Sequence, residues 1–180
     1  MKELSLNVLD IAENSVKAGA SLIRILLEET GEMLTVTVTD NGCGMKEEIL
    51  RGVIDPFYTT RTTRRVGLGI PLFKMAAEQT GGELRITSRH ESEFPDSHGT
   101  EITGVFYKQH IDCAPMGDII STVTTLIQGH PNIDFEFRHD AADHEVRLDT
   151  RELREVLGAE VPLNEAEVLR WIRDYLNEQY

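Results

Sequence analysis

Residues 34–44 have the sequence Leu-Thr-Val-Thr-Val-Thr-Asp-Asn-Gly-Cys-Gly, and this stretch decides the fold. From Leu34 to Thr39 apolar and hydroxyl residues alternate strictly, which predicts a β-strand with one face buried. Asp40 follows directly at the strand end, where its carboxylate can accept a hydrogen bond from an exocyclic amine. Gly42 and Gly44 let the backbone approach a flat ligand closely. The alternative is an ordinary glycine turn that leaves a strand.

The segments on either side of this stretch predict an α+β fold. Residues 4–18 carry apolar side chains at mostly helical spacing, and the β-rich run 22–27 precedes a turn at 30–32, so a helix and then a hairpin are expected. Downstream, the pattern predicts helices at 47–53 and 68–80 and strands at 83–89 and 100–108. We therefore expect a two-layer α/β sandwich with helices on one face of a sheet.

The last 70 residues differ in charge and pattern. Residues 1–110 hold 16 acidic and 12 basic side chains, whereas residues 111–180 hold 15 and 6. We expect two parts, 1–110 and a small acidic α/β extension at 111–180, with helices at 116–128, 151–157 and 165–177 and strands at 133–138 and 145–148. The extension could bind a partner, form a homodimer or brace the sheet. Trp171 and Tyr175, one helical turn apart, are expected to pack in its core; the alternative is an interface hot spot.

Composition limits the possible partners. The 180 residues carry a formal net charge of −13, which argues against nucleic acid and anionic membranes as partners. No apolar run approaches the roughly 18 residues that a membrane span needs, and nothing at the N-terminus resembles a signal peptide. Cys43 and Cys113 form no CxxC pair. We expect a cytoplasmic protein whose anionic ligands bind at a local basic spot.

A polar stripe on the first predicted helix is the second candidate for chemistry. Asp10, Asn14 and Lys17 stand at positions i, i+4 and i+7, which share one helix face. Such a stripe could serve a metal-bound polyphosphate, with the carboxylate as base, the amide oxygen on Mg²⁺ and the ammonium on phosphate. The alternative is the solvated face of an amphipathic helix.

The third candidate lies where the 68–80 helix begins. Gly67-Leu68-Gly69-Ile70 follows three arginines, Arg61, Arg64 and Arg65, in an otherwise acidic chain. Free backbone N–H groups and the helix dipole make such a start a natural phosphate site. The spacing matches neither a P-loop nor the dinucleotide fingerprint of Rossmann folds.

The order and spacing of these motifs closely resemble the successive boxes of the gyrase, chaperone, histidine kinase and MutL ATPase superfamily. The resemblance covers residues 1 to about 108, and its motifs are Asp10 with Asn14, Asp40-x-Gly42-x-Gly44, Asp55-Pro56-Phe57-Tyr58-Thr59-Thr60-Arg61, Gly67-x-Gly69 and Gly99-Thr100. The segments 13–20 and 40–44 look like MutL-type ATPases. The segments 56–61 and 67–70 look like the catalytic domain of sensor histidine kinases, and this second likeness is weighed more heavily.

The resemblance implies a Bergerat-type fold and a role for each matching residue. Asn14 would hold Mg²⁺, Asp40 would bind the adenine amine, and the remaining ATP contacts would come from Lys17, Gly42, Gly44, Phe57, Thr59, Arg61, Arg64, Gly67, Leu68, Gly69 and Thr100. Asp10 stands where hydrolysing relatives carry a glutamate that activates water. Its side chain is one methylene shorter, which puts efficient hydrolysis in question.

The resemblance also implies a function. No helical hairpin with a phosphoacceptor histidine precedes the motifs in this sequence, so a stand-alone Mg·ATP-binding protein is expected, similar in this respect to anti-sigma factors that phosphorylate a partner. It would transfer phosphate to an unidentified protein partner or hydrolyse ATP slowly. The alternative is a non-catalytic regulatory module in which ATP gates partner binding.

Overall fold

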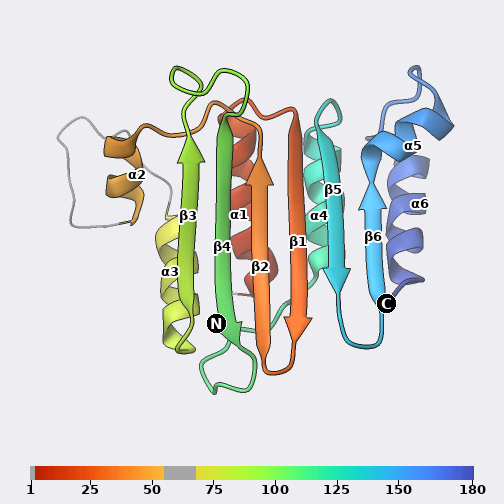
Figure 1. The fold of residues 1–180 in the computed structure, drawn as a ribbon. Helices are drawn as coiled ribbons and strands as arrows, with labels where there is room; N and C mark the ends of the chain where they lie inside the picture. The colour runs from red at the N-terminus through yellow and green to blue at the C-terminus, as the bar shows by residue number, and fades with distance from the viewer. Residues whose placement is uncertain (1–2, 55–67) are drawn as a thin grey trace.

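The computed structural model describes residues 3–54 and 68–180. Its strands form one six-stranded sheet (Figure 1). The strand order across the sheet is β3-β4-β2-β1-β5-β6. The strands are β1 (Leu22–Thr30), β2 (Met33–Asp40), β3 (Glu83–Arg89), β4 (Gly99–Tyr107), β5 (Asp134–Asp140) and β6 (Glu145–Asp149). Neighbouring strands are antiparallel except for β1 and β5, which are parallel.

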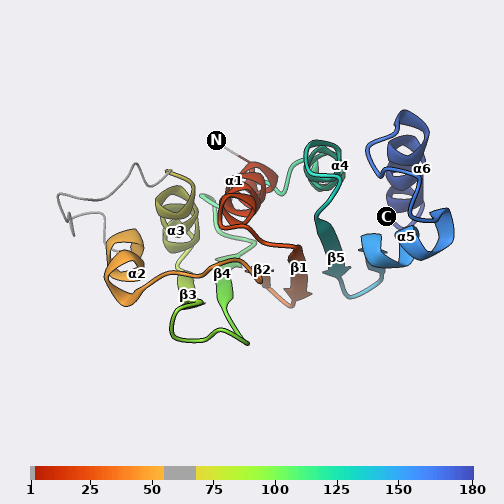
Figure 2. The same ribbon diagram turned by 90° about the horizontal axis from the view of Figure 1, so that it is seen from above.

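Four helices form a second layer on one face of this sheet (Figure 2). From the β3 side to the β6 side they lie in the order α3 (Gly69–Gln79), α1 (Leu4–Lys17), α4 (Ile119–Gly129) and α6 (Ala166–Asn177). Two shorter helices, α2 (Glu47–Ile54) and α5 (Thr150–Leu157), lie at the two ends of the sheet. The predicted α+β class and two-layer arrangement are confirmed.

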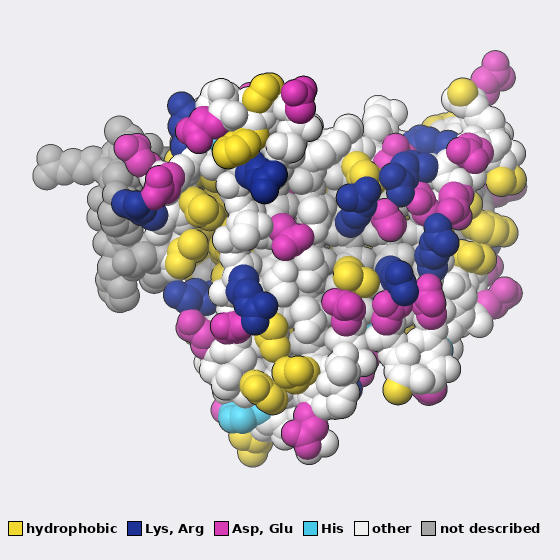
Figure 3. Space-filling model, viewed as in Figure 1, with side chains coloured by type: hydrophobic (Ala, Val, Ile, Leu, Met, Phe, Trp, Pro, Cys, Tyr) yellow, Lys and Arg dark blue, Asp and Glu magenta, His cyan; other side chains and the backbone are white. Residues whose placement is uncertain are grey.

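The alternation in β2 sorts its side chains between the two faces of the sheet. Leu34, Val36 and Val38 are buried beneath the helices. The intervening threonines point to the opposite face, which no described helix covers; there Thr37 and Thr103 are 3.1 Å apart at their hydroxyl oxygens. Charged side chains are spread over this open face, with some hydrophobic ones between them (Figure 3). The predicted hairpin of β1 and β2 is confirmed, with Thr30 paired with Met33.

Residues 111–180 extend the same sheet. Leu22 at the start of β1 pairs with Asp134 at the start of β5, so the first strand of the chain has a partner from the acidic extension. Helix α4 packs beside α1 in the second layer. The division at residue 110 stays a prediction, but the sheet and the helical layer both run across it.

The free edge of β6 is covered by the C-terminal end of the chain. The side-chain amide of Gln179 accepts a hydrogen bond from the Arg147 N–H at 2.9 Å and donates one to the Arg147 carbonyl at 3.2 Å. It therefore occupies the two backbone groups that another strand would use.

A polar cluster ties the C-terminal residue to the centre of the sheet. Glu29 in β1 accepts a hydrogen bond from Lys108 at 2.8 Å, and its other carboxylate oxygen lies 3.0 Å from Nε2 of the buried His139. Nδ1 of His139 lies 2.8 Å from the hydroxyl of Tyr180. The Lys108 hydrogen bond is the main cause that lowers the pKa of Glu29 below its usual value. Burial, together with the nearby Glu29 charge, raises the pKa of Tyr180 to about 12.

The prediction that Trp171 and Tyr175 pack in the core is wrong. The two rings stack on each other with centroids 4.9 Å apart, and they remain 49% and 38% exposed. Helix α6 buries Val168, Ile172 and Leu176 instead. These three share a face at i, i+4 and i+8, and the aromatic pair lies at its margin.

Candidate functional site

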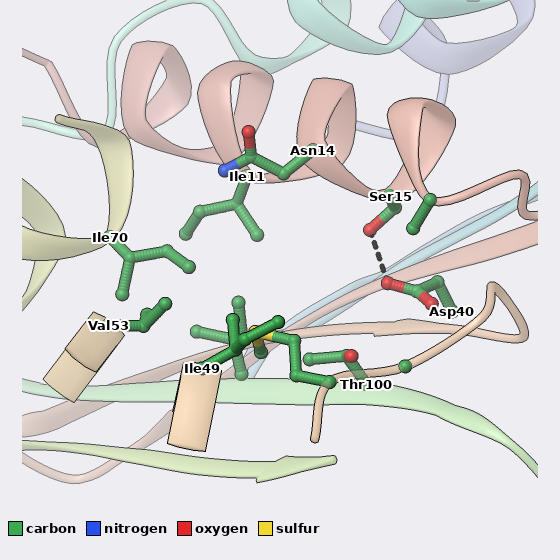
Figure 4. A pocket seen from close by; sticks show the side chains of 12 residues that line it. Ile11, Asn14, Ser15, Asp40, Ile49, Val53, Ile70 and Thr100 are labelled. Atoms are coloured by element: carbon green, nitrogen blue, oxygen red, sulfur yellow. Dashed lines mark hydrogen bonds between the residues drawn. The ribbon is translucent and has the colours of Figure 1, made fainter. Parts of the chain in front are cut away.

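A pocket of about 230 Å³ lies between helix α1, the end of the sheet and helices α2 and α3. Its lining is mostly apolar, with a few polar groups from three different elements (Figure 4). In that view Asp40 and Thr100 lie at one side, Val53 and Ile70 at the other, and Asn14 projects from α1 above them. An apolar slot with a few placed polar groups is the usual form of a small-ligand site.

Asp40 is held in place from two directions. Its Oδ2 accepts a hydrogen bond from the buried Ser15 hydroxyl at 2.6 Å, and its Oδ1 accepts one from the Gly42 N–H at 2.9 Å. Because each carboxylate oxygen can accept more than one hydrogen bond, both retain a capacity to accept from a ligand. The carboxylate is thus fixed in orientation at the polar side of an apolar slot.

The two glycines after Asp40 are required by backbone packing. Gly44 has φ +71°, and a Cβ there would lie 1.9 Å from the carbonyl oxygen of Arg89. At Gly42 a Cβ would lie 2.9 Å from both the Cβ and the carbonyl oxygen of Ala18. The Cys43 N–H donates to that Ala18 carbonyl at 2.9 Å, so the loop is closed against the end of α1. Gly42 and Gly44 therefore let this loop form one wall of the pocket.

Side chains from β3 and β4 hold the same loop from the other side. Ser88 accepts a hydrogen bond from the Met45 N–H at 2.7 Å, and its hydroxyl lies 2.8 Å from that of the pocket residue Thr100. Nδ1 of His98 lies 2.5 Å from the Gly42 carbonyl oxygen. Thr100 is thus part of a hydrogen-bonded chain that reaches the glycine loop.

Asn14, Asp10 and Gly69 meet where α1 crosses the start of α3. A Cβ at Gly69 would lie 3.0 Å from the Asp10 Cβ and 3.9 Å from Nδ2 of Asn14, so glycine allows this close approach. The Asn14 side chain lines the pocket, while Asp10 is exposed at the contact. A hard amide oxygen at this position suits Mg²⁺, which is commonly held by one or two protein oxygens with phosphate and water as the other ligands.

Within residues 3–54 and 68–180, the start of helix α3 beside Asn14 has no side-chain cap. Leu68 is the N-cap residue, its side chain makes no capping hydrogen bond, and the first turn contains no acidic residue. Helix N-termini of this kind attract phosphate through their free N–H groups and the helix dipole. Leu68 itself is 72% exposed and does not line the pocket.

The remaining predicted residues fall outside the pocket or outside the described residues. Lys17 is exposed at the last turn of α1 and does not line the pocket. The proposed roles of Phe57, Thr59, Arg61, Arg64 and Gly67 concern positions that the structure does not describe. The described polar site thus consists of Asn14, Ser15, Asp40 and Thr100, with Asp10 at its margin.

Several residues of the pocket were missed from the sequence. In the sequence Ser15 stands out only as part of a MutL-like segment, and nothing there indicates its hydrogen bond to Asp40. The apolar lining was also missed: Ile11, Met45, Ile49, Val53, Ile70 and Ile102. The signal available for them was their position on helix faces next to the glycine boxes, which cannot be distinguished from ordinary core packing in a single sequence.

A family model places this pocket among known proteins. Residues 2–110 match the family described as histidine kinase-, DNA gyrase B-, and HSP90-like ATPase. The chain belongs to this family. The predicted superfamily resemblance is therefore confirmed, and the fold described above is that of an ATPase domain of this kind.

Curated relatives of this family member fall into two groups. The signal transduction histidine-protein kinase AtoS of Escherichia coli is 26% identical over 88 residues, which are 49% of this chain and 14% of AtoS. The DNA mismatch repair protein MutL of Listeria monocytogenes is 27% identical over 184 aligned positions, which cover 84% of this chain and 30% of MutL. The family member described here thus spans less than a third of either relative.

Among solved structures, the Aquifex aeolicus MutL ATPase domain complexed with ADP has the same fold. It is 14% identical, covers 83% of this chain and 66% of the other, and gives a TM-score of 0.53. Residues 1–110 make up only about three-fifths of the 180, so this likeness extends into the acidic extension. The acidic extension continues the sheet of the ATPase domain and shares the fold of the longer neighbour.

Among the described residues of this family member, no helix has the length and apolar character needed to cross a bilayer.

Proposed function

We propose that the chain binds Mg·ATP in the pocket of Figure 4 and uses it for phosphoryl transfer to a protein partner or for slow hydrolysis. The observation that carries the proposal is the fixed orientation of the Asp40 carboxylate. This carboxylate, oriented by Ser15 and by the Gly42 N–H, lines a mostly apolar pocket of about 230 Å³. Membership of an ATPase family supports adenine as the ligand of this pocket.

The adenine ring would lie in the apolar slot with its amine donating to Asp40. Ile102 forms part of the buried strand side of the slot, and Met45 and Ile49 line it from the glycine loop and α2. Burying the faces of the ring against these side chains supplies the non-specific part of the affinity. The amine at Asp40 supplies the selection of adenine, because guanine presents a carbonyl oxygen at the corresponding position and leaves the carboxylate unpaired.

The phosphates would point toward Asn14 and the start of α3. Asn14 would hold Mg²⁺ through its amide oxygen, and the ion supplies charge neutralisation of the phosphates when bound. The open N–H groups at the start of α3 would bind phosphate oxygens. Asp10, against Gly69 at this end of the pocket, would accept a proton from the attacking hydroxyl or water.

A second function, an ATP-gated binding module without turnover, is supported by the length of the Asp10 side chain. An aspartate carboxylate lies one methylene nearer to the α1 backbone than a glutamate carboxylate would. A general base must come within hydrogen-bond distance of the proton that it removes. A base that falls short would leave ATP bound and unhydrolysed.

Incubation with γ-phosphate-labelled ATP and Mg²⁺, alone and with a cell extract, tests the proposal. Labelled protein or free labelled phosphate, lost in Asp40→Asn, supports turnover. An ATP-dependent rise in melting temperature with neither product supports the gated module. If ATP produces no rise in melting temperature, the pocket is not an ATP site and both functions fail.

A further inference from the structure

The acidic extension carries a second pocket, far along the sheet from the nucleotide pocket. A groove of about 260 Å³ lies between α5 and α6, over the end of β6. We call it the α5–α6 groove; its lining is Arg147, Leu148, Asp149, Glu152, Leu153, Val156, Trp171 and Tyr175. None of these residues has a part in the ATP site.

Several apolar side chains that line the groove are exposed to solvent. Val156 is 85% exposed, and the stacked Trp171 and Tyr175 rings form the opposite wall. Leu148, which is buried, forms the floor. Exposed aromatic side chains around an apolar hollow are a usual mark of a protein-binding surface.

Acidic side chains border the aromatic wall. On a helix, Glu167, Asp174 and Glu178 stand at i−4, i+3 and i+7 from Trp171, so they share its side of α6. None of the three forms an ion pair within residues 3–54 and 68–180. On the face seen in Figure 3, hydrophobic, acidic and basic side chains lie together at this end of the molecule.

The basic residues of the extension are mostly neutralised. Arg138, Arg147, Arg151 and Arg154 are each bound to an acidic side chain. Arg173 follows Trp171 by two positions and therefore projects from another side of α6, whereas Arg170 stands at i+3 from Glu167 and i−4 from Asp174 and offsets part of their charge. Three acidic side chains against this one arginine leave a net negative charge beside Trp171, which favours a cationic partner and disfavours an anionic one.

We propose that the α5–α6 groove binds a cationic, amphipathic segment of a partner protein. An aliphatic side chain of that segment would enter the groove between Val156 and Tyr175, and its Lys or Arg would lie over Trp171 and beside Glu167 and Asp174. Aromatic faces attract such cations directly, and the neighbouring carboxylates add to this attraction. The proposal does not depend on ATP binding.

The sole tryptophan of the chain gives a direct readout of the groove. The full chain, without nucleotide, is titrated with three synthetic peptides of equal length: Leu/Lys amphipathic, Leu/Glu amphipathic and Ser/Lys. We expect the Leu/Lys peptide alone to shift Trp171 emission, with an affinity that falls as salt is raised. Equal binding of the Leu/Glu or the Ser/Lys peptide would overturn the proposal.

Two variants and a matched control locate the binding. Val156→Asp, at a highly exposed position, should fold normally and weaken the Leu/Lys peptide about tenfold or more, as should Trp171→Ala measured through a labelled peptide. Tyr107→Ala removes an aromatic ring of comparable exposure, 42% against 49% for Trp171, at the far end of β4 and should leave the affinity unchanged.

If both groove variants bind the peptide as the wild type does, the groove is not the site. Sedimentation of the wild type and of Val156→Asp tests the other occupant that the groove could hold, a second copy of this chain. Self-association that Val156→Asp abolishes would show that a second copy fills the groove, and the proposed cationic partner would then be wrong.

Discussion

The Ser15 hydroxyl on α1 donates a hydrogen bond to the Asp40 carboxylate at the end of β2, with 2.6 Å between the two oxygens. This bond joins the helical layer to the sheet at Asp40, the residue that we propose contacts the adenine amine. Ser15 is almost fully buried, so solvent does not compete for its hydroxyl. The orientation of the carboxylate is therefore set by the fold before any ligand arrives, which lowers the cost of binding.

Asp40→Asn should remove most of the ATP affinity while leaving the fold intact. An amide has the same shape but carries no charge, and its NH2 group replaces one accepting oxygen with a donor that would face the Gly42 N–H, the Ser15 hydroxyl or the adenine amine. We expect a loss of about 2 kcal/mol, roughly thirtyfold in Kd. Calorimetric titration with Mg·ATP measures it. Asp96→Asn, on the exposed 91–98 loop, is the control that should bind normally. An unaltered affinity in Asp40→Asn would refute the adenine assignment.

Asp10 variants should separate binding from turnover. We expect Asp10→Asn to bind Mg·ATP as the wild type does and to release no phosphate, since Asp10 lies at the margin of the pocket and does not line it. Asp10→Glu extends the carboxylate by one methylene and should raise turnover about tenfold or more. Phosphate release measured at saturating ATP tests both. A faster Asp10→Asn would show that Asp10 is not the base.

Gly44→Ala should be strongly destabilising. The added Cβ would meet the Arg89 carbonyl oxygen at 1.9 Å in a backbone conformation with φ +71°. We expect the free energy of unfolding to fall by about 2–4 kcal/mol. Gly129→Ala, at the end of α4, places a Cβ with no atom within 4 Å and should leave stability equal or raise it by up to about 1 kcal/mol. Urea denaturation of both variants tests the contrast, and equal midpoints would contradict it.

The contribution of Glu29 to stability should depend on pH. Its pKa is lowered in the folded protein, first by the Lys108 hydrogen bond, so the folded state favours the ionised form. The stabilisation is therefore present above the usual carboxyl pKa of 4.5 and is lost as pH falls through the lower folded value. Glu29→Gln should cost about 1 kcal/mol at pH 7 and much less near pH 3. Chemical denaturation at both pH values measures the difference; a cost that is the same at both would rule out the ionised interaction.

Local patterns predicted the helices and strands well because the sequence signal for each one lies in consecutive residues. The alternation from Leu34 to Thr39 gave β2 its buried face, and the double glycine at 81–82 marked the end of α3. Asp40, Gly44, Asn14 and Thr100 were predicted as site residues, and the structure places all four around one pocket.

Long-range relationships could not be read in the same way. The pairing of β1 with β5 joins residues 22 and 134, and no local pattern specifies which strand a parallel neighbour will choose. Ser15 next to Asn14 looks like any small helical residue until β2 is placed beneath it. Trp171 was misplaced because a large aromatic at helical spacing is more often buried, whereas here three smaller side chains fill the core face of α6.

The central position of β1 has a practical consequence for anyone preparing this protein. A fragment that stops at residue 110 would remove β5 from β1 and α4 from α1. The seven residues of β1 that pair with β5 would become an open hydrogen-bonding edge, and an apolar face of α1 would be exposed to water. Such edges pair readily with other chains. The 1–110 fragment should therefore aggregate on expression, even though it includes every motif by which the family is recognised.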